Sequence, residues 1–111
     1  MNNRSQEPQD TTNPFNDIAK LLACDWTPAI LQLLQRGNQR YSQIEFALHE
    51  ASPRELSTRL RYLITQGIIK RHVQGTPPTT NYELTTKGDA LQELLQAVVK
   101  YKNAVNKSSS L

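Results

Sequence analysis

Arginine and hydroxyl side chains recur along residues 52–66 at the spacing of one helix face. Arg54, Thr58 and Arg61 are separated by four and three residues, so a helix brings all three to one side. Guanidinium groups form paired hydrogen bonds with phosphate oxygens and guanine edges, and hydroxyl groups donate to phosphate. These residue types at this spacing favour the binding of a polyanion. The apolar residues of the same stretch are expected to be buried: Leu56, Leu60, Leu63 and Ile64.

Residues for other chemistry are scarce. The chain has one cysteine, Cys24, and two histidines, His49 and His72, and no two of the three show the spacing of metal ligands. The sequence contains no glycine-rich phosphate loop and no nucleophile motif. We therefore expect no metal site, no cofactor and no enzymatic activity.

Positive charge is concentrated in the same part of the chain. Residues 54–71 contain five cationic side chains and one carboxylate, a local charge of +4, whereas the whole chain carries +3. Such a patch attracts a polyanion such as nucleic acid. A solvated charged surface without any partner is the alternative, and charge alone does not decide between them.

Length and composition predict one folded domain with short tails. Residues 1–13 and 106–111 are polar and lack an apolar period, so we expect both to be disordered and residues 14–105 to fold. A single cysteine excludes an internal disulfide, and we see no signal peptide or apolar run of membrane-spanning length. We expect a soluble, cytoplasmic protein that has no membrane partner.

Start and stop signals predict four helices before Gly67. Pro14 suits the first position of the first helix, and Thr27, which precedes a proline, is expected to cap the second. Ser42 and Glu45 have the spacing of a capping box at the start of the third.

The fourth helix has the strongest signals. Ser52 and Glu55 form another capping box, Pro53 suits the first helical position, and Gly67 is a left-handed stop. Only about four residues separate this helix from the third. Two capped helices joined by a tight turn predict a helix-turn-helix arrangement.

The residue pattern changes after Gly67. Two stretches rich in branched and aromatic residues flank a turn that contains Pro77 and Pro78, which predicts a β-hairpin over residues 68–85. A last helix is expected to start near Thr85. The order of elements predicts an α+β, mostly helical fold. The predicted fold is a winged helix-turn-helix domain, with the hairpin as the wing and an additional C-terminal dimerisation helix.

The last helix is long for so small a domain, and its apolar face exceeds what three short helices and a hairpin can cover. We therefore expect a homodimer in which the first and last helices pack against a second copy. The expected interface residues are Phe15, Ile18, Leu91, Leu94, Leu95 and Val98.

In the winged helix-turn-helix plan, the second helix of the pair enters the major groove of double-stranded DNA, and the wing lies near the flanking backbone. The recognition helix (residues 52–66) and the wing (residues 68–85) therefore supply most of the candidate contacts. Arg59 lies nearer the buried side, so packing or an ion pair is expected for it. The candidate DNA-binding residues are Arg40, Ser42, Ser52, Pro53, Arg54, Ser57, Thr58, Arg61, Lys70, Arg71, Thr76, Thr79 and Thr80.

A winged-helix protein–protein interaction module without specific DNA binding is the alternative, because this fold does not by itself guarantee DNA binding. Such a module would show an apolar patch on the recognition helix, where this sequence has arginines. The arginines favour DNA.

Three segments resemble, in order, the HxlR-type winged helix-turn-helix transcriptional regulators: "DWTPAILQLLQRGNQRYSQI", "LSTRLRYLITQGIIKR" and "NYELTTKGDAL". The resemblance covers residues 14–99. It implies a bacterial or archaeal homodimer that binds near-palindromic operators and represses or activates transcription, with the first and last helices at the dimer interface. Several members of that family respond to oxidants, quinones or aldehydes.

This sequence differs from the sensing members of the family at the first helix. Where those members carry a cysteine just before the proline of that helix, this chain has Asn13. Cys24 lies near the start of the second helix and is either a displaced redox sensor or a small buried side chain. We expect the structural role, and the sequence does not identify an oxidant or small-molecule effector.

Overall fold

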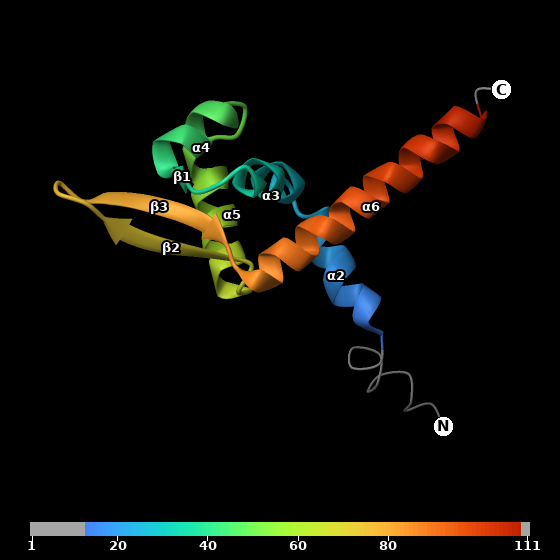
Figure 1. Cartoon of the computed structure of the whole chain (residues 1–111), viewed down its shortest axis with the longest axis horizontal. Helices are drawn as coiled ribbons and strands as arrows, with labels where there is room; N and C mark the ends of the chain where they lie inside the picture. Colours follow the sequence, from blue (N-terminus) through green and yellow to red (C-terminus); the bar gives the residue numbers. More distant parts are fainter. Residues whose placement is uncertain (1–12, 110–111) are drawn as a thin grey trace.

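The computed structural model describes residues 13–109 of the 111-residue chain. The disorder expected for residues 1–12, 110 and 111 therefore lies outside the described residues. The mostly helical α+β winged helix-turn-helix fold with a long C-terminal helix is confirmed (Figure 1). The elements are helices α2 (Pro14–Ala23) and α3 (Thr27–Gln35), strand β1 (Gln39–Arg40), helices α4 (Tyr41–Ala47) and α5 (Pro53–Thr65), strands β2 (Ile69–Gln74) and β3 (Thr79–Leu84), and helix α6 (Thr86–Ser109).

The sheet has three antiparallel strands in the order β1-β3-β2. β2 and β3 form the predicted hairpin, in which Ile69 pairs with Leu84 at the base and Gln74 pairs with Thr79 at the tip. The hairpin extends away from the helices on the side opposite to the far end of α6 (Figure 1). It therefore has the position of a wing beside the helix-turn-helix pair α4–α5.

Helix α5 begins and ends as the sequence predicts. The Ser52 Oγ accepts a hydrogen bond from the Glu55 backbone N at 3.1 Å, and the Glu55 carboxylate accepts one from the Ser52 backbone N at 2.8 Å. Gly67 follows the helix with φ +76°, a conformation that side-chain-bearing residues rarely adopt. Both ends of the recognition helix are thus specified locally.

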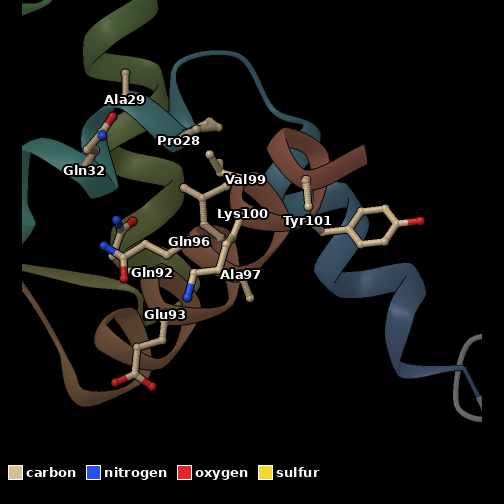
Figure 2. Close-up of a pocket in the computed structure, with 12 residues that line it drawn as sticks. Pro28, Ala29, Gln32, Gln92, Glu93, Gln96, Ala97, Val99, Lys100 and Tyr101 are labelled. Carbon is tan, nitrogen blue, oxygen red and sulfur yellow. The ribbon is translucent and has the colours of Figure 1, made fainter. Parts of the chain in front are cut away.

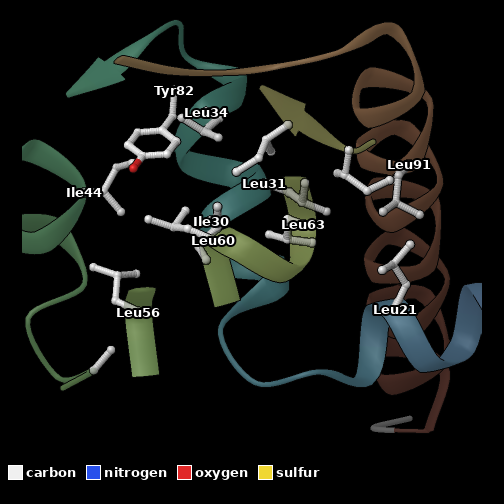
Figure 3. Close-up of a cluster of buried hydrophobic side chains, with 13 residues drawn as sticks. Leu21, Ile30, Leu31, Leu34, Ile44, Leu56, Leu60, Leu63, Tyr82 and Leu91 are labelled. Carbon is white, nitrogen blue, oxygen red and sulfur yellow. The ribbon is translucent and has the colours of Figure 1, made fainter. Parts of the chain in front are cut away.

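The apolar core lies between α3, α5, the base of the sheet and the start of α6 (Figure 3). Leu56, Leu60 and Leu63 are buried as predicted, whereas Ile64 is 36% exposed. Ile64 differs because it lies at the margin of the apolar stripe that the three leucines form. The core residues are Leu21, Ile30, Leu31, Leu34, Ile44, Ala51, Leu56, Leu60, Leu63, Ile68, Ile69, Tyr82 and Leu91.

Two predicted caps are wrong. Trp26, with φ +70°, precedes α3, and Thr27 is already inside the helix with its hydroxyl buried and unpaired among residues 13–109. Helix α4 starts at Tyr41, where the Gln43 carboxamide accepts from the Arg40 backbone N at 2.7 Å, so Ser42 and Glu45 form no capping box. The helix starts early because Arg40 pairs with β3 and the chain turns directly after it.

Two predicted boundaries also differ from the structure. Asn13, assigned to the tail, caps α2 by accepting a hydrogen bond from the Phe15 backbone N at 3.0 Å. Helix α6 continues to Ser109, beyond the expected end at residue 105, because residues 89–109 contain no glycine or proline to stop it. Among residues 13–109, no helix has the length and apolar character needed to cross a bilayer.

Candidate nucleic-acid interface

The outward face of α5 carries free cationic side chains. Arg54, Thr58 and Arg61 are exposed, on the side of the helix opposite to the buried leucines. Neither guanidinium group takes part in a hydrogen bond or an ion pair within residues 13–109. Pro53, at the first position of the helix, is exposed as well. This face therefore presents unpaired donors to an external acceptor.

Arg59 differs from the two free arginines. Its Nε donates to the Asp25 backbone carbonyl at 2.9 Å, and its guanidinium lies 5.4 Å from the centre of the Tyr62 ring. The prediction that Arg59 packs instead of pointing outward is confirmed. The contact anchors α5 to the loop between α2 and α3.

Tyr41 contacts the recognition helix, although nothing in the sequence predicts it. Its hydroxyl lies 3.5 Å from the Ser57 Oγ on the recognition helix, and its ring lies 6.5 Å from that of Tyr82 in β3. Ser57 is half-buried, and its contact with Tyr41 leaves it less available to DNA than the exposed Thr58. Sixteen residues separate Tyr41 from Ser57, and no local pattern indicates a contact over that interval.

The candidate DNA-binding residues around the start of α4 and α5 are exposed, but they differ in whether their side chains already make a hydrogen bond within the protein. Arg40 and Ser42, around the start of α4, have no side-chain partner among residues 13–109. Ser52 is exposed as well, although its oxygen already accepts the capping hydrogen bond. Its hydroxyl proton remains available.

The two faces of the wing differ in charge. Paired residues of antiparallel strands project to the same side, so Lys70, His72 and Glu83 share one face. The Lys70 Nζ lies 3.1 Å from one Glu83 carboxylate oxygen, and the His72 Nε2 lies 3.9 Å from the other. The hydrogen bond from Lys70 is the largest influence on Glu83 and lowers the pKa of its carboxyl, with partial desolvation opposing the shift. We call this the Lys70 face.

Arg71 projects from the opposite face, together with Val73 and Thr80. At the base of the hairpin this face continues into the buried Ile69 and Tyr82, which belong to the same core as α5. We call it the Arg71 face. The Arg71 side chain is exposed and has no partner among residues 13–109. The free cation of the wing is therefore on the side of the recognition helix.

The wing tip contributes hydroxyl groups. Thr76 is exposed in the turn. The Thr79 Oγ1 donates to the Gln74 carbonyl at 3.2 Å across the tip, and Thr79 and Thr80 are half-buried. Of the three predicted threonines, Thr76 is the most accessible.

Most of the large apolar side chains that are exposed lie on α6, and Phe46 on α4 is 84% exposed. Phe15 is 75% exposed and Val98 is 48% exposed, and Leu94, Val99, Tyr101 and Val105 are exposed along α6. Ile18 and Leu95 are half-buried, and Leu91 belongs to the core of its own chain. Of the predicted interface residues, Phe15, Leu94 and Val98 are thus exposed, two are half-buried, and Leu91 is only 7% exposed.

A groove of about 1020 Å³ runs between α3 and α6 (Figure 2). Pro28, Ala29 and Gln32 line its α3 side, and Leu95 and Val99 are among the residues on its α6 side. At its edge the Gln35 carboxamide oxygen accepts from the Gln92 Nε2 at 3.0 Å and from the Gln96 Nε2 at 3.2 Å. These amides fix α6 against α3.

Metal-ligating side chains do not gather anywhere in the described part of the chain, where no group of three or more His, Cys, Asp and Glu side chains is placed to hold an ion. Cys24 is half-buried after α2, and its Sγ donates to the Lys20 carbonyl at 3.1 Å. The thiol is thus hydrogen-bonded to the last turn of the helix that it follows, as expected for a cysteine with a structural role.

The HxlR-like helix-turn-helix family model matches residues 21–110, which include α3, the α4–α5 pair, the wing and α6. The chain belongs to the HxlR-like helix-turn-helix family. It is a helix-turn-helix transcriptional regulator, and the proteins it resembles are regulators, not enzymes.

Two relatives from Bacillus subtilis (strain 168) illustrate the likeness. The chain is 40% identical over 88 residues to the HTH-type transcriptional regulator YvaP, covering 78% of this chain and 82% of YvaP. It is 35% identical over 77 residues to the HTH-type transcriptional regulator YodB, covering 68% of this chain and 69% of YodB.

Solved structures of transcriptional regulators share this fold. The reduced form of YodB superposes with a TM-score of 0.76 at 31% identity, covering 80% of this chain and 89% of that one. A MarR-family regulator from Enterococcus faecalis V583 superposes with a TM-score of 0.80 at 24% identity, covering 94% and 98%. At that identity the second likeness indicates a shared fold alone.

Proposed function

We propose that this HxlR-like regulator acts in the cytoplasm as a homodimer that binds a near-palindromic operator in double-stranded DNA. The recognition helix α5 enters the major groove, and the wing contacts the flanking backbone through the Arg71 face. The observation that carries this proposal is the pair of exposed, unpaired arginines, Arg54 and Arg61, on a helix anchored at both ends. An anchored helix holds its outward side chains in a fixed register against base edges.

The exposed surface of α5 disfavours the alternative of a protein–protein module. Protein-binding surfaces are centred on apolar side chains, and charged residues are depleted there. The centre of the α5 surface is instead Arg54, Thr58 and Arg61. An arginine and hydroxyl surface suits phosphates and guanine edges.

Dimerisation is supported by the exposed apolar face of α6. Leu94, Val98, Tyr101 and Val105 recur at intervals of three and four residues along one side of the helix. A seam of this spacing packs against a second helix. Phe15 on α2 adds an exposed aromatic side chain that a second copy would cover. A two-fold dimer presents its two recognition helices to successive turns of the same DNA groove.

The test is a selection of duplex fragments from random DNA, followed by binding measurements with Arg61→Ala. If Arg61 reads a base, the variant loses about 1–3 kcal/mol of binding free energy for the selected site. If it contacts phosphate alone, binding weakens on every sequence and the dependence on salt becomes shallower.

Lys20→Ala is the matched control, because it removes one exposed cation from α2, a helix outside the α4–α5 pair and the wing. We expect it to leave affinity for the selected site nearly unchanged. A wild-type protein that retains no duplex at low salt would overturn the proposal.

A further inference from the structure

The end of the recognition helix is bonded to the start of α6, although the whole wing separates them in sequence. The Thr85 Oγ1 donates to the Gly67 carbonyl at 2.6 Å and lies 3.0 Å from the Ile68 carbonyl. The Thr85 backbone N also donates to the Ile68 carbonyl at 3.0 Å. One threonine therefore closes the hairpin at its base and holds the residues that follow α5.

The same hydroxyl begins the next helix. The Gly88 backbone N donates to the Thr85 Oγ1 at 3.0 Å, and the Asp89 backbone N donates to the Thr85 carbonyl at 2.8 Å. Thr85 is thus the N-terminal cap of α6. The same side chain also donates to the carbonyls of Gly67 and Ile68, which follow α5. One side chain therefore links the ends of the two helices.

Lys87 adds a second bond between the two helices. Its Nζ donates to the carbonyl of Gln66, the C-cap residue of α5, at 3.0 Å. A cation at this end is favourable because the last carbonyls of a helix are unpaired and carry partial negative charge.

Gly88 lets the two segments approach closely. A Cβ atom at this position would overlap the Ile68 carbonyl and press on the Leu84 side chain. Residues 85–88 and 66–68 therefore form one packed, hydrogen-bonded unit, which we call the α5–α6 junction. The amides of Gln35, Gln92 and Gln96 fix α6 against α3, and the junction fixes it against α5.

The length of α6 amplifies any change in this angle. A helix of 24 residues spans about 36 Å at about 1.5 Å per residue. A rotation of about 10° at its base therefore moves the far end by roughly 6 Å, nearly two steps of about 3.4 Å along DNA. In a dimer held together by α6, that angle determines the distance between the two recognition helices.

We propose that Thr85 and Lys87 are positioning residues that set the half-site spacing which the dimer accepts in its operator. They contact no DNA and act through the angle between α5 and α6. The inference rests on the proposed function, because it requires a dimer joined through α6 and a two-fold operator.

The experiment uses the operator selected by the wild-type protein and a series of duplexes in which the half-sites are moved apart or together by one base pair. Wild type is expected to bind one spacing best. Thr85→Val keeps the side-chain shape and removes the hydroxyl with its contacts to Gly67, Ile68 and Gly88. It is expected to lose at least roughly three- to tenfold of that discrimination, which is about the worth of a single hydrogen bond. Lys87→Met is expected to act in the same direction.

Two matched variants separate positioning from general damage. Thr85→Ser retains the hydroxyl and is expected to restore the wild-type spacing preference. Thr86→Val makes the same substitution at the exposed neighbouring residue and is expected to change nothing. In all of these variants, the base preference within each half-site and the mass of the dimer are expected to equal those of wild type. A variant that is only destabilised would change these two properties as well.

The possible outcomes are distinct. If wild type discriminates between spacings and Thr85→Val and Lys87→Met discriminate equally well, the junction does not set the spacing and the proposed function stands. If wild type selects single half-sites, or no DNA at all, the two-fold operator proposal fails and this inference fails with it.

Discussion

The Lys70 ammonium lies 3.1 Å from the Glu83 carboxylate across the wing, while Arg71, its neighbour in sequence, projects from the opposite face. The two adjacent cations therefore have different surroundings. The charge of Lys70 is partly neutralised by Glu83. Arg71 has no ion-pair partner among residues 13–109 and lies on the face that continues toward α5. Their contributions to DNA binding should differ accordingly.

We expect Arg71→Ala to weaken DNA binding on every sequence and to reduce the slope of log affinity against log salt by about one. Lys70→Ala should have a much smaller effect, because its charge is already compensated by Glu83. Fluorescence anisotropy titrations at several salt concentrations measure both quantities. Equal losses for the two variants would show that the pairing of Lys70 does not withhold it from DNA.

The acid stability of the wing should depend on Glu83. Its pKa in the folded chain lies below the ordinary value of 4.5, chiefly because Lys70 donates a hydrogen bond to the carboxylate. The folded state therefore binds this proton less readily than the unfolded state, and the pair contributes stability above pH 4.5 that is lost as the pH falls through the lowered pKa.

Urea unfolding of wild type and Glu83→Gln at neutral pH and between pH 5 and 3 tests this expectation. The stability difference between them should be largest near neutrality and shrink on acidification. The change should be small, because solvent screens an ion pair whose Lys70 side chain is 60% exposed and whose Glu83 side chain is 28% exposed. In a Lys70→Met background, the stability difference that Glu83→Gln causes should no longer depend on pH in this way, because the cation that lowers the pKa is absent. A difference that grows on acidification would show that folding raises the pKa of Glu83 instead of lowering it.

Dimerisation should depend on the exposed side of α6. Val98→Lys places a charge in the proposed seam, so we expect sedimentation at micromolar concentration to shift from dimer toward monomer. The fold should persist, because Val98 is 48% exposed in the single chain. Glu93→Lys introduces a lysine elsewhere on the same helix and should leave the dimer intact. A wild-type monomer at these concentrations would argue against the assembly.

Cys24 should be a structural residue. Its thiol is half-buried and donates to the Lys20 carbonyl, a hydrogen bond that a serine hydroxyl also makes. We expect Cys24→Ser to retain wild-type DNA affinity, and hypochlorite or quinone to leave the wild-type affinity unchanged through this thiol. Rapid modification of Cys24 in the native protein, with a change in affinity that the serine variant lacks, would identify it as a sensor instead.

The sequence by itself determined the features of the fold that depend on neighbouring residues. Ser52 and Glu55 are three residues apart, and Gly67 directly follows the last turn, so both ends of α5 were predictable from local chemistry. The leucines of α5 were predictable because burial follows the helix period. The outward position of Arg54 and Arg61 follows from the same period.

Only the tertiary structure decided which candidate side chains are free. Tyr41 meets Ser57, Arg59 reaches the Asp25 carbonyl, and Lys87 reaches the end of α5, over intervals of 16, 34 and 21 residues. The early start of α4 has the same origin, since Arg40 pairs with a strand 41 residues later in the chain. Sequence spacing determines which face of its own element a side chain occupies, whereas its partner on another element is determined by how the elements pack. For that reason the composition of the α5 surface was readable from the sequence, and the α5–α6 junction was not.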